Sequence, residues 1–171
     1  MEFTLIEKEE EESYYIVSGI GECTNNNVRI PLTISGIKVT EIGANAFAGQ
    51  NIENVIISDN VVNIGANAFS GCTNLKSLTI GKGVKNIELF AFQECTNLQN
   101  IYFNAIEMND LAPSFGNYGS RFANAGRGNS GIKVVIGQEV TKIPNYLFSA
   151  SSPMGFGNYP NIVRVEFEIG G

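Results

Sequence analysis

The sequence predicts a β-rich solenoid, in which short parallel strands line one face and short helical or 3₁₀ turns lie opposite. Three observations predict it: a nine-residue motif that recurs three times, a strand-like motif between the copies, and an N-terminal segment that can cover one end. Self-similarity at a period of roughly 20–50 residues is typical of stacked repeats, which bury their apolar faces only against their neighbours.

The recurring motif is Val-Thr-Glu-Ile-Gly-Ala-Asn-Ala-Phe at 39–47. It returns at 61–69 and again at 84–92, so the copies start 22 and then 23 residues apart. Stacking would place equivalent residues about 4.8 Å apart along the hydrogen bonds between strands. We therefore expect two buried columns, an aromatic one of Phe47, Phe69 and Phe92 and an aliphatic one of Ile42, Ile64 and Ile87.

A second motif, Asn-Leu-x-x-Leu-x-Ile, follows the first at 74–80 and 97–103, with a related copy at 51–57. Its last apolar positions alternate, which indicates a short strand with one buried face. The stretch before it ends at Gly49 or Gly71, and a piece this short favours a single helical turn, 3₁₀ in character. Asn51, Asn74 and Asn97 are expected to form a hydrogen-bonded ladder.

The pattern continues less regularly toward the C-terminus. Residues 132–136 match the strand, 140–148 match the first motif with Pro144 in place of glycine, and 161–167 form a final strand. Residues 107–115 keep the length of the motif but lack its Val and Ile, so we interpret them as a degenerate repeat. The prediction is about five repeats across 39–167.

The domain prediction is one solenoid over 13–171, preceded by an arm. Residues 1–12 hold six glutamates and one lysine, so most of the net charge of −6 lies there. Such a run is expected to be solvated and partly disordered. Residues 13–38 are expected to form an N-terminal β-hairpin cap, with strands at 14–17 and 28–34, because an open solenoid end exposes core and strand edge.

Composition narrows the classes of function. The chain has no histidine, which removes the commonest general base and metal ligand. It has no basic surface for nucleic acid. Three cysteines are a poor disulfide framework, and Cys72 and Cys95 at equivalent positions favour a buried column over a disulfide or metal site. We predict no cofactor, no metal site, no catalytic residue and no enzymatic activity.

No apolar run approaches the roughly 18 residues that cross a bilayer, so no membrane span is expected. The N-terminus lacks the basic, apolar and small-residue pattern of a signal peptide. Two alternatives remain open from the residues: a cytoplasmic protein, or a sequence that begins after a cleavage site.

The motif copies at 39–47 and 69–80 resemble the BspA-like, or Treponema-type, leucine-rich repeats, and 14–40 is similar to the entry segment of that family. The resemblance covers 14–103 strongly and 132–167 moderately. It implies a leucine-rich-repeat solenoid in an extracellular or cell-surface bacterial protein. It further implies a partner that is a host or bacterial surface protein or a glycan.

Two extra lengths, near 116–130 and 149–160, fall at the same place in the repeat and would emerge as neighbours. Inserted loops often form the binding face of a repeat protein. Their Tyr, Phe and Arg residues are typical of recognition surfaces, although they could instead pack back onto the stack. The ligand-contact residues predicted here are Phe115, Tyr118, Arg121, Phe122, Arg127, Met154, Phe156 and Tyr159.

The solvent-facing side of the strands is a second candidate surface, with mixed polar residues such as Lys76, Thr79 and Tyr102, and an ordinary solvated face is the alternative there. The leading hypothesis for function is a non-catalytic, adhesin-like protein-interaction module at the cell surface or secreted. The alternative is a structural spacer within a longer surface protein whose activity lies elsewhere.

Overall fold

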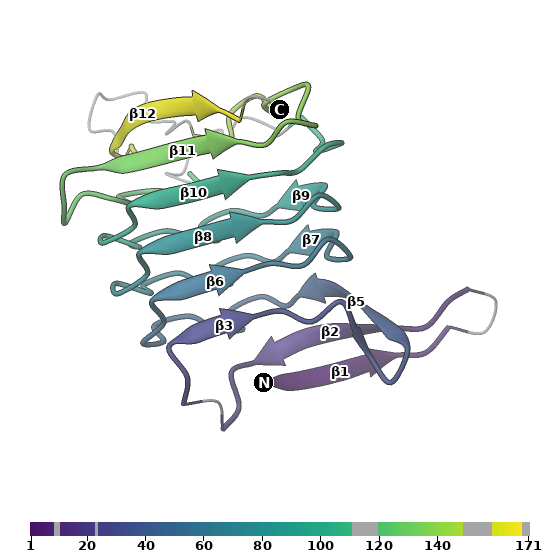
Figure 1. Ribbon diagram of the computed structural model, residues 1–171. Helices are drawn as coiled ribbons and strands as arrows, with labels where there is room; N and C mark the ends of the chain where they lie inside the picture. Colours follow the sequence, from purple (N-terminus) through teal and green to yellow (C-terminus); the bar gives the residue numbers. More distant parts are fainter. Residues whose placement is uncertain (9–10, 23, 111–119, 149–158, 169–171) are drawn as a thin grey trace.

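The computed structural model describes residues 1–8, 11–22, 24–110, 120–148 and 159–168. These residues form twelve short strands (Figure 1). The strands are β1 (Glu2–Ile6), β2 (Tyr14–Gly19), β3 (Asn27–Arg29), β4 (Thr33–Ile34), β5 (Ile37–Ile42), β6 (Asn54–Ile56), β7 (Asn63–Ile64), β8 (Ser77–Ile80), β9 (Asn86–Ile87), β10 (Asn100–Phe103), β11 (Ile132–Ile136) and β12 (Ile162–Phe167).

The strands belong to two sheets on opposite sides of one core. One sheet has the order β12-β11-β10-β8-β6-β3, and every neighbouring pair in it is parallel. The other has the order β1-β2-β5-β7-β9, with β4 beside β5. Figure 1 shows the first sheet climbing from β3 to β12, with β7 and β9 behind it. We call each turn of this climb a rung.

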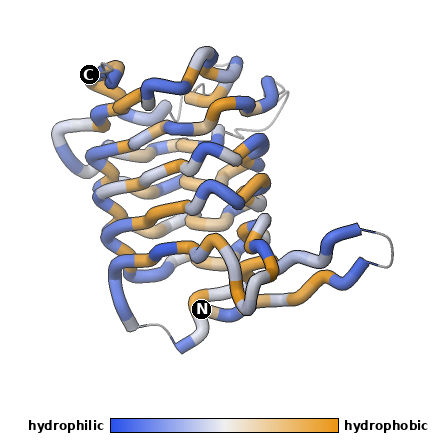
Figure 2. The backbone as a smooth tube through the Cα atoms, turned by 45° about the vertical axis from the view of Figure 1, so that its right-hand side comes forward, coloured by the Kyte–Doolittle hydropathy of each residue, from blue (hydrophilic) through white to orange (hydrophobic). Residues whose placement is uncertain are grey.

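The core consists of in-register columns that run through the rungs. Val28, Val55, Leu78, Ile101 and Val134 are paired from strand to strand and buried. Residues between them along each strand face solvent, and the resulting alternation of hydrophobic and hydrophilic positions is visible along the strands in Figure 2. The strands that the alternation of apolar and polar residues predicted are therefore present.

The predicted aromatic column is confirmed. Phe47, Phe69 and Phe92 are fully buried, and consecutive ring centroids lie 4.9 and 5.2 Å apart with interplanar angles of 6° and 4°. The aliphatic column is buried as well, with Ile42, Ile64 and Ile87 no more than 1% exposed. These two columns fix the in-register stacking that the motif spacing predicts.

The predicted helical turns are wrong for the described residues, which contain neither α-helix nor 3₁₀-helix. Each of the first three turns instead holds two residues with left-handed backbone, one on either side of the phenylalanine. Around Phe47 they are Asn45 (φ 59°) and Gly49 (φ 68°), and around Phe69 they are Asn67 (φ 56°) and Gly71 (φ 71°). Left-handed residues interrupt a right-handed helix, and Asn and Gly adopt that conformation most readily.

The N-terminal segment also differs from the expectation. Glu2–Ile6 form β1, an antiparallel partner of β2, and Phe3 packs edge-on against Tyr15. The alternation of polar and apolar residues in Glu-Phe-Thr-Leu-Ile indicates a strand, but the glutamates that follow led us to interpret the whole of 1–12 as a disordered arm. The expected pairing of 14–17 with 28–34 is also wrong, because β2 lies beside β1 and β5 whereas β3 begins the other sheet.

The fourth rung uses a different phenylalanine from the one expected. Phe122 stacks on Phe92 with centroids 4.9 Å apart, and Phe148 follows at 5.2 Å with a tilt of 45°. The backbone N–H of Phe92 donates to the carbonyl of Arg121, as that of Phe69 does to Ala91. The column position expected for Phe115 is therefore occupied by Phe122, and Phe115 lies outside the described residues.

Candidate functional site

The outward face of the six-stranded sheet carries two in-register columns. One, the central column, consists of Arg29, Ile56, Thr79, Tyr102, Val135 and Glu166. The other, the polar column, consists of Asn27, Asn54, Ser77, Asn100, Lys133 and Arg164. Neighbouring strands of a sheet lie about 4.8 Å apart, so each column extends across all six strands.

The central column exposes apolar surface. Ile56 is 39% exposed and Tyr102 is 38% exposed, with Thr79 between them in register. A hollow of about 270 Å³ opens where β3, β6 and β8 end. Its lining includes Arg29, Ile56 and Thr79 of the central column and the exposed side chain of Leu32. An apolar strip and a hollow thus share one face.

Polar groups beside the strip bond to one another. The side-chain amide of Asn54 donates to that of Asn27, and the Lys76 ammonium lies 2.8 Å from the Glu53 carboxylate. These contacts are exposed, so they hold side chains in place more than they stabilise the fold. They also leave the strip without a strong charge of either sign.

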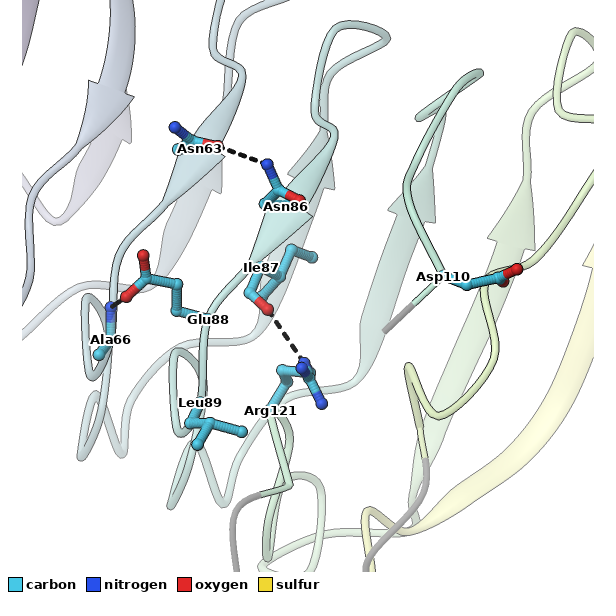
Figure 3. A pocket seen from close by; sticks show the side chains of 8 residues that line it. All are labelled: Asn63, Ala66, Asn86, Ile87, Glu88, Leu89, Asp110 and Arg121. Atoms are coloured by element: carbon cyan, nitrogen blue, oxygen red, sulfur yellow. Dashed lines mark hydrogen bonds between the residues drawn. The ribbon is translucent and has the colours of Figure 1, made fainter. Parts of the chain in front are cut away.

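A second hollow, of about 630 Å³, lies on the side of β7 and β9 (Figure 3). Asn63, Asn86, Glu88, Leu89, Asp110 and Arg121 are among its lining residues. Both acidic side chains already have partners. Glu88 accepts from the backbone N–H of Ala66 at 3.0 Å, and Asp110 pairs with Lys142 and accepts from the N–H of Asn145. Figure 3 shows the Asp110 carboxylate pointing away from Arg121.

Those contacts set the direction of one pKa in this hollow. The hydrogen bond from Lys142, followed by that from the Asn145 backbone, lowers the pKa of Asp110. Asp110 therefore stays ionised at neutral pH, which does not suit a general acid.

Arg121 has a structural role in this hollow. Its Nε donates to the carbonyl of Ile87 at 2.9 Å. In earlier rungs the matching carbonyls, those of Ile42 and Ile64, accept instead from the backbone N–H of Gly65 and Glu88. Burial lowers the pKa of Arg121, and the side chain makes no ion pair within the described residues. The guanidinium thus supplies a donor where a regular rung supplies a peptide group.

The eight predicted contact residues separate into three groups. Phe115, Tyr118, Met154 and Phe156 lie outside the described residues. Phe122 is fully buried in the aromatic column and Arg121 is almost fully buried, so we correct both from surface contacts to structural residues. Arg127 and Tyr159 remain exposed.

Arg127 and Tyr159 are brought together although 32 positions separate them. The Nε of Arg127 donates to the carbonyl of Tyr159 at 3.1 Å. Nearby, the backbone N–H of Asn161 donates to the carbonyl of Ala125 at 2.9 Å. The expected neighbourhood of the two segments therefore holds where the structure describes them, and an aromatic side chain and a guanidinium share that surface.

The thiols of Cys72 and Cys95 are buried, as predicted, and Cys23 lies outside the described residues. Cys72 and Cys95 are free, fully buried, and donate to the carbonyls of Phe47 and Phe69 at 3.0 and 3.3 Å. Burial raises the pKa of Cys72 to about 11 and that of Cys95 well above its usual value. Such thiols are not nucleophilic near neutral pH. The described residues include no group of three or more potential metal ligands.

The asparagine ladder forms only in part where we expected it. The Asn74 amide donates to that of Asn51 at 2.7 Å, but the Asn97 amide donates to the carbonyl of Thr73. A second ladder was missed: Asn86 donates to Asn63 and Asn109 donates to Asn86, both at 2.8 Å. The sequence signal for this ladder was an asparagine at the third position of the motif copies at 61–69 and 84–92.

A family model described as the BspA type leucine-rich repeat region (6 copies) matches residues 40–150, about two thirds of the chain. The chain belongs to this family. The BspA-type repeat accounts for the rungs described above, with strands on the sheet face and a phenylalanine in each turn. No curated protein matches the sequence.

Three solved structures share the fold. A leucine-rich repeat protein from Bacteroides capillosus is 19% identical with a TM-score of 0.57, and the match covers 97% of this chain and 94% of that one. A leucine-rich repeat protein from T. pallidum is 20% identical with a TM-score of 0.52, over 96% and 78%.

The third is described as a leucine rich cell surface protein from Faecalibacterium prausnitzii. It is 20% identical with a TM-score of 0.52, and the match covers 97% of this chain but 41% of that chain. These likenesses establish a β-rich leucine-rich-repeat fold with parallel strands. Within the described residues there is also no helix of a length and apolarity that would cross a membrane.

Proposed function

We propose that this chain is a non-catalytic interaction module, displayed at a bacterial cell surface or secreted, that holds its partner on the outward face of the six-stranded sheet. The observation that carries the proposal is the exposed strip of Ile56 and Tyr102 beside the polar column. Half-exposed aromatic and aliphatic side chains framed by hydrogen-bonding groups are the composition of recognition surfaces.

The family supports the interaction role, and the surface location rests on one relative described as a cell surface protein. The partner class we favour is a host or bacterial surface protein or a glycan. Either would use the same chemistry, because Tyr102 offers a flat ring and the amides of Asn54 and Asn100 offer donors and acceptors. We extend the contact surface to Arg127 and Tyr159.

The binding test probes arrays of host extracellular-matrix proteins, bacterial surface proteins and glycans with the labelled chain. For any array member that binds, Tyr102→Ala is expected to weaken binding at least about tenfold, the effect of losing about 1.4 kcal/mol. The matched control is Leu89→Ala, because Leu89 is also 38% exposed but lies in the other hollow. The control is expected to change binding less than about twofold.

Two outcomes would contradict the sheet-face assignment: binding that Leu89→Ala removes and Tyr102→Ala leaves intact, or binding that neither variant changes. Arg127→Ala and Tyr159→Ala separately test the second surface. If both leave affinity unchanged, the contact area ends at the sheet. Location is tested by proteolysis of intact cells, and protection of the chain until the cells are lysed would overturn the surface assignment in favour of a cytoplasmic protein.

A structural spacer is the second candidate, and one observation favours it. The polar groups around the strip are already satisfied by each other, as in the Asn54–Asn27 and Lys76–Glu53 contacts. Absence of binding across all arrays would support the spacer.

A further inference from the structure

The last strand of the six-stranded sheet, β12, exposes side chains from columns that are buried elsewhere. Val165 pairs in register with Val134, and Phe167 with Ile136, both of which are about 1% exposed. Val165 itself is 49% exposed and Phe167 is 69% exposed. Within the described residues, the core columns thus end at an open sheet edge on β12, the strand at the top of Figure 1. A flat, apolar edge strand is a template for pairing with another strand.

The backbone of β12 is oriented for such pairing. The N–H of Glu168 donates to the carbonyl of Ile136, so the peptide groups of Arg164, Glu166 and Glu168, which follow the register shift in the pairing with β11, face β11. Successive peptide groups of a strand point to opposite edges. The N–H and C=O groups of Val165 and Phe167 therefore face the open edge, whereas Val163 lies at the register shift.

The sequence of β12, Ile-Val-Arg-Val-Glu-Phe, is self-complementary about Val165. We propose that the open edge binds the same edge of a second copy of this chain, with the two β12 strands antiparallel and the two-fold axis at Val165. In this register Val165 faces its equivalent and exchanges both hydrogen bonds with it. Arg164 faces Glu166 of the other copy, twice.

Geometry supports this register over a shifted one. Arg164 and Glu166 would form the non-hydrogen-bonded pairs, in which opposite side chains approach most closely. A shift by two residues would place Arg164 opposite its own equivalent or Glu166 opposite its own, and like charges directly opposite destabilise a sheet. The axis is perpendicular to the sheet, so the core side of both copies would stay on one side and Val165 and Phe167 would extend a shared apolar surface.

The test is the association state of the chain by sedimentation equilibrium over about 1–200 µM, since edge pairing is a small interface with a micromolar Kd. The wild-type chain is expected to dimerise. Arg164→Glu places Glu opposite Glu, and Glu166→Arg places Arg opposite Arg. Each is expected to raise the dimer Kd at least about tenfold, with two repulsive pairs in place of two attractive ones.

The double variant Arg164→Glu with Glu166→Arg restores both pairs and is expected to bring the Kd back to within about threefold of wild type. An equimolar mixture of the two single variants is expected to form a heterodimer, because their strands are complementary to each other. Arg29→Glu is the control, since Arg29 belongs to the same central column at the opposite end of the sheet and should leave the dimer unchanged.

A wild-type chain that stays monomeric throughout this range would overturn the proposal. So would a dimer that both single variants leave intact, a double variant that fails to recover, or open-ended oligomers in place of a dimer. Circular dichroism of each variant checks the fold, and the mixture gives an answer even if one homodimer is lost through local rearrangement of β12.

Discussion

The two ends of the stack present the same column in opposite states. Val28 at the β3 end is 3% exposed, whereas Val165, its counterpart on β12, is 49% exposed. The β3 end is covered by the N-terminal segment that contains β1 and β2, from which Met1, Phe3 and Ile20 pack against the core (Figure 1). Within the described residues, no such cover lies on β12. A repeat in the middle of the stack is covered by its two neighbours. A repeat at either end lacks one neighbour, so its apolar face must be covered in another way.

The difference between the covered interior of the stack and its exposed β12 end should be largest in the aromatic column. Phe92→Ala is expected to cost about 3–5 kcal/mol, because the ring is fully buried between two parallel neighbours. Phe148→Ala at the end of the column should cost about 1–2 kcal/mol, since that ring is only partly buried and tilted. Urea unfolding of both variants measures the difference, and equal losses would show that the column does not weaken toward β12.

The same substitution at the two ends of one column is the sharpest comparison. Val28→Lys is expected to cost about 3 kcal/mol, because it places an unpaired ammonium in the covered end. Val165→Lys is expected to change the stability of the monomer by less than about 0.5 kcal/mol. Thermal unfolding at a concentration below the dimer Kd gives both values. A large loss at Val165 would mean that β12 is covered in solution.

Raising the pH should loosen the inner rungs. The pKa of Cys72 is about 11 in the folded chain, above that of an unfolded thiol, so unfolding releases a proton at alkaline pH. The stability from the buried neutral thiol is complete below the unfolded pKa and is lost as pH rises toward 11, by about 2 kcal/mol. Urea midpoints at pH 8 and pH 10.5 test this against the Cys72→Ala, Cys95→Ala double variant, whose midpoint should fall less.

Acid should act on the open end instead. The hydrogen bond from Lys133, ahead of the charge of Arg164, lowers the pKa of Glu166. The stability from the ionised carboxylate is therefore present above the usual glutamate pKa and is lost as pH falls through the lowered one. The same protonation removes the partner of Arg164 in the proposed dimer, so dimerisation should weaken in acid more than folding does.

The link between the regular rungs and those near β12 is tested by Arg121→Met. The variant keeps the hydrophobic stem but leaves the Ile87 carbonyl without its donor, at an expected cost of about 1 kcal/mol. Hydrogen exchange should show faster opening around 120–126 than in the rung of Phe69. Unchanged exchange there would mean that the guanidinium does not tie these rungs together.

The regular part of this fold could be predicted because its evidence is local and repeated. Three copies of the motif place Phe47, Phe69 and Phe92 in one column and Cys72 with Cys95 in another, whatever the shape of the turns. The turn conformation was less accessible, because a short Ala-Asn-Ala-Phe segment fits a helical turn equally well. The left-handed Asn45 and Asn67 are understood only once the stacked hydrogen bonds are known.

The irregular part failed for identifiable reasons. Counting eight residues from a degenerate start selected Phe115. The residue two places after the phenylalanine does not separate the two candidates, because Asn117 follows Phe115 as Asn124 (φ 58°) follows Phe122. Arg121 was assigned to a surface because guanidinium groups usually lie there, and its burial is explained by the Ile87 carbonyl that accepts its hydrogen bond.

The in-register column of phenylalanines also has a genetic consequence. Because the backbone hydrogen bonds of each rung go to the rungs before and after it, and the copies at 39–47 and 61–69 are nearly identical in sequence, a crossover between them would delete or duplicate one whole coil in frame. The join would present matching partners on both sides. The length of such a protein can therefore change by recombination in single steps of about two dozen codons, while its two ends stay as they are.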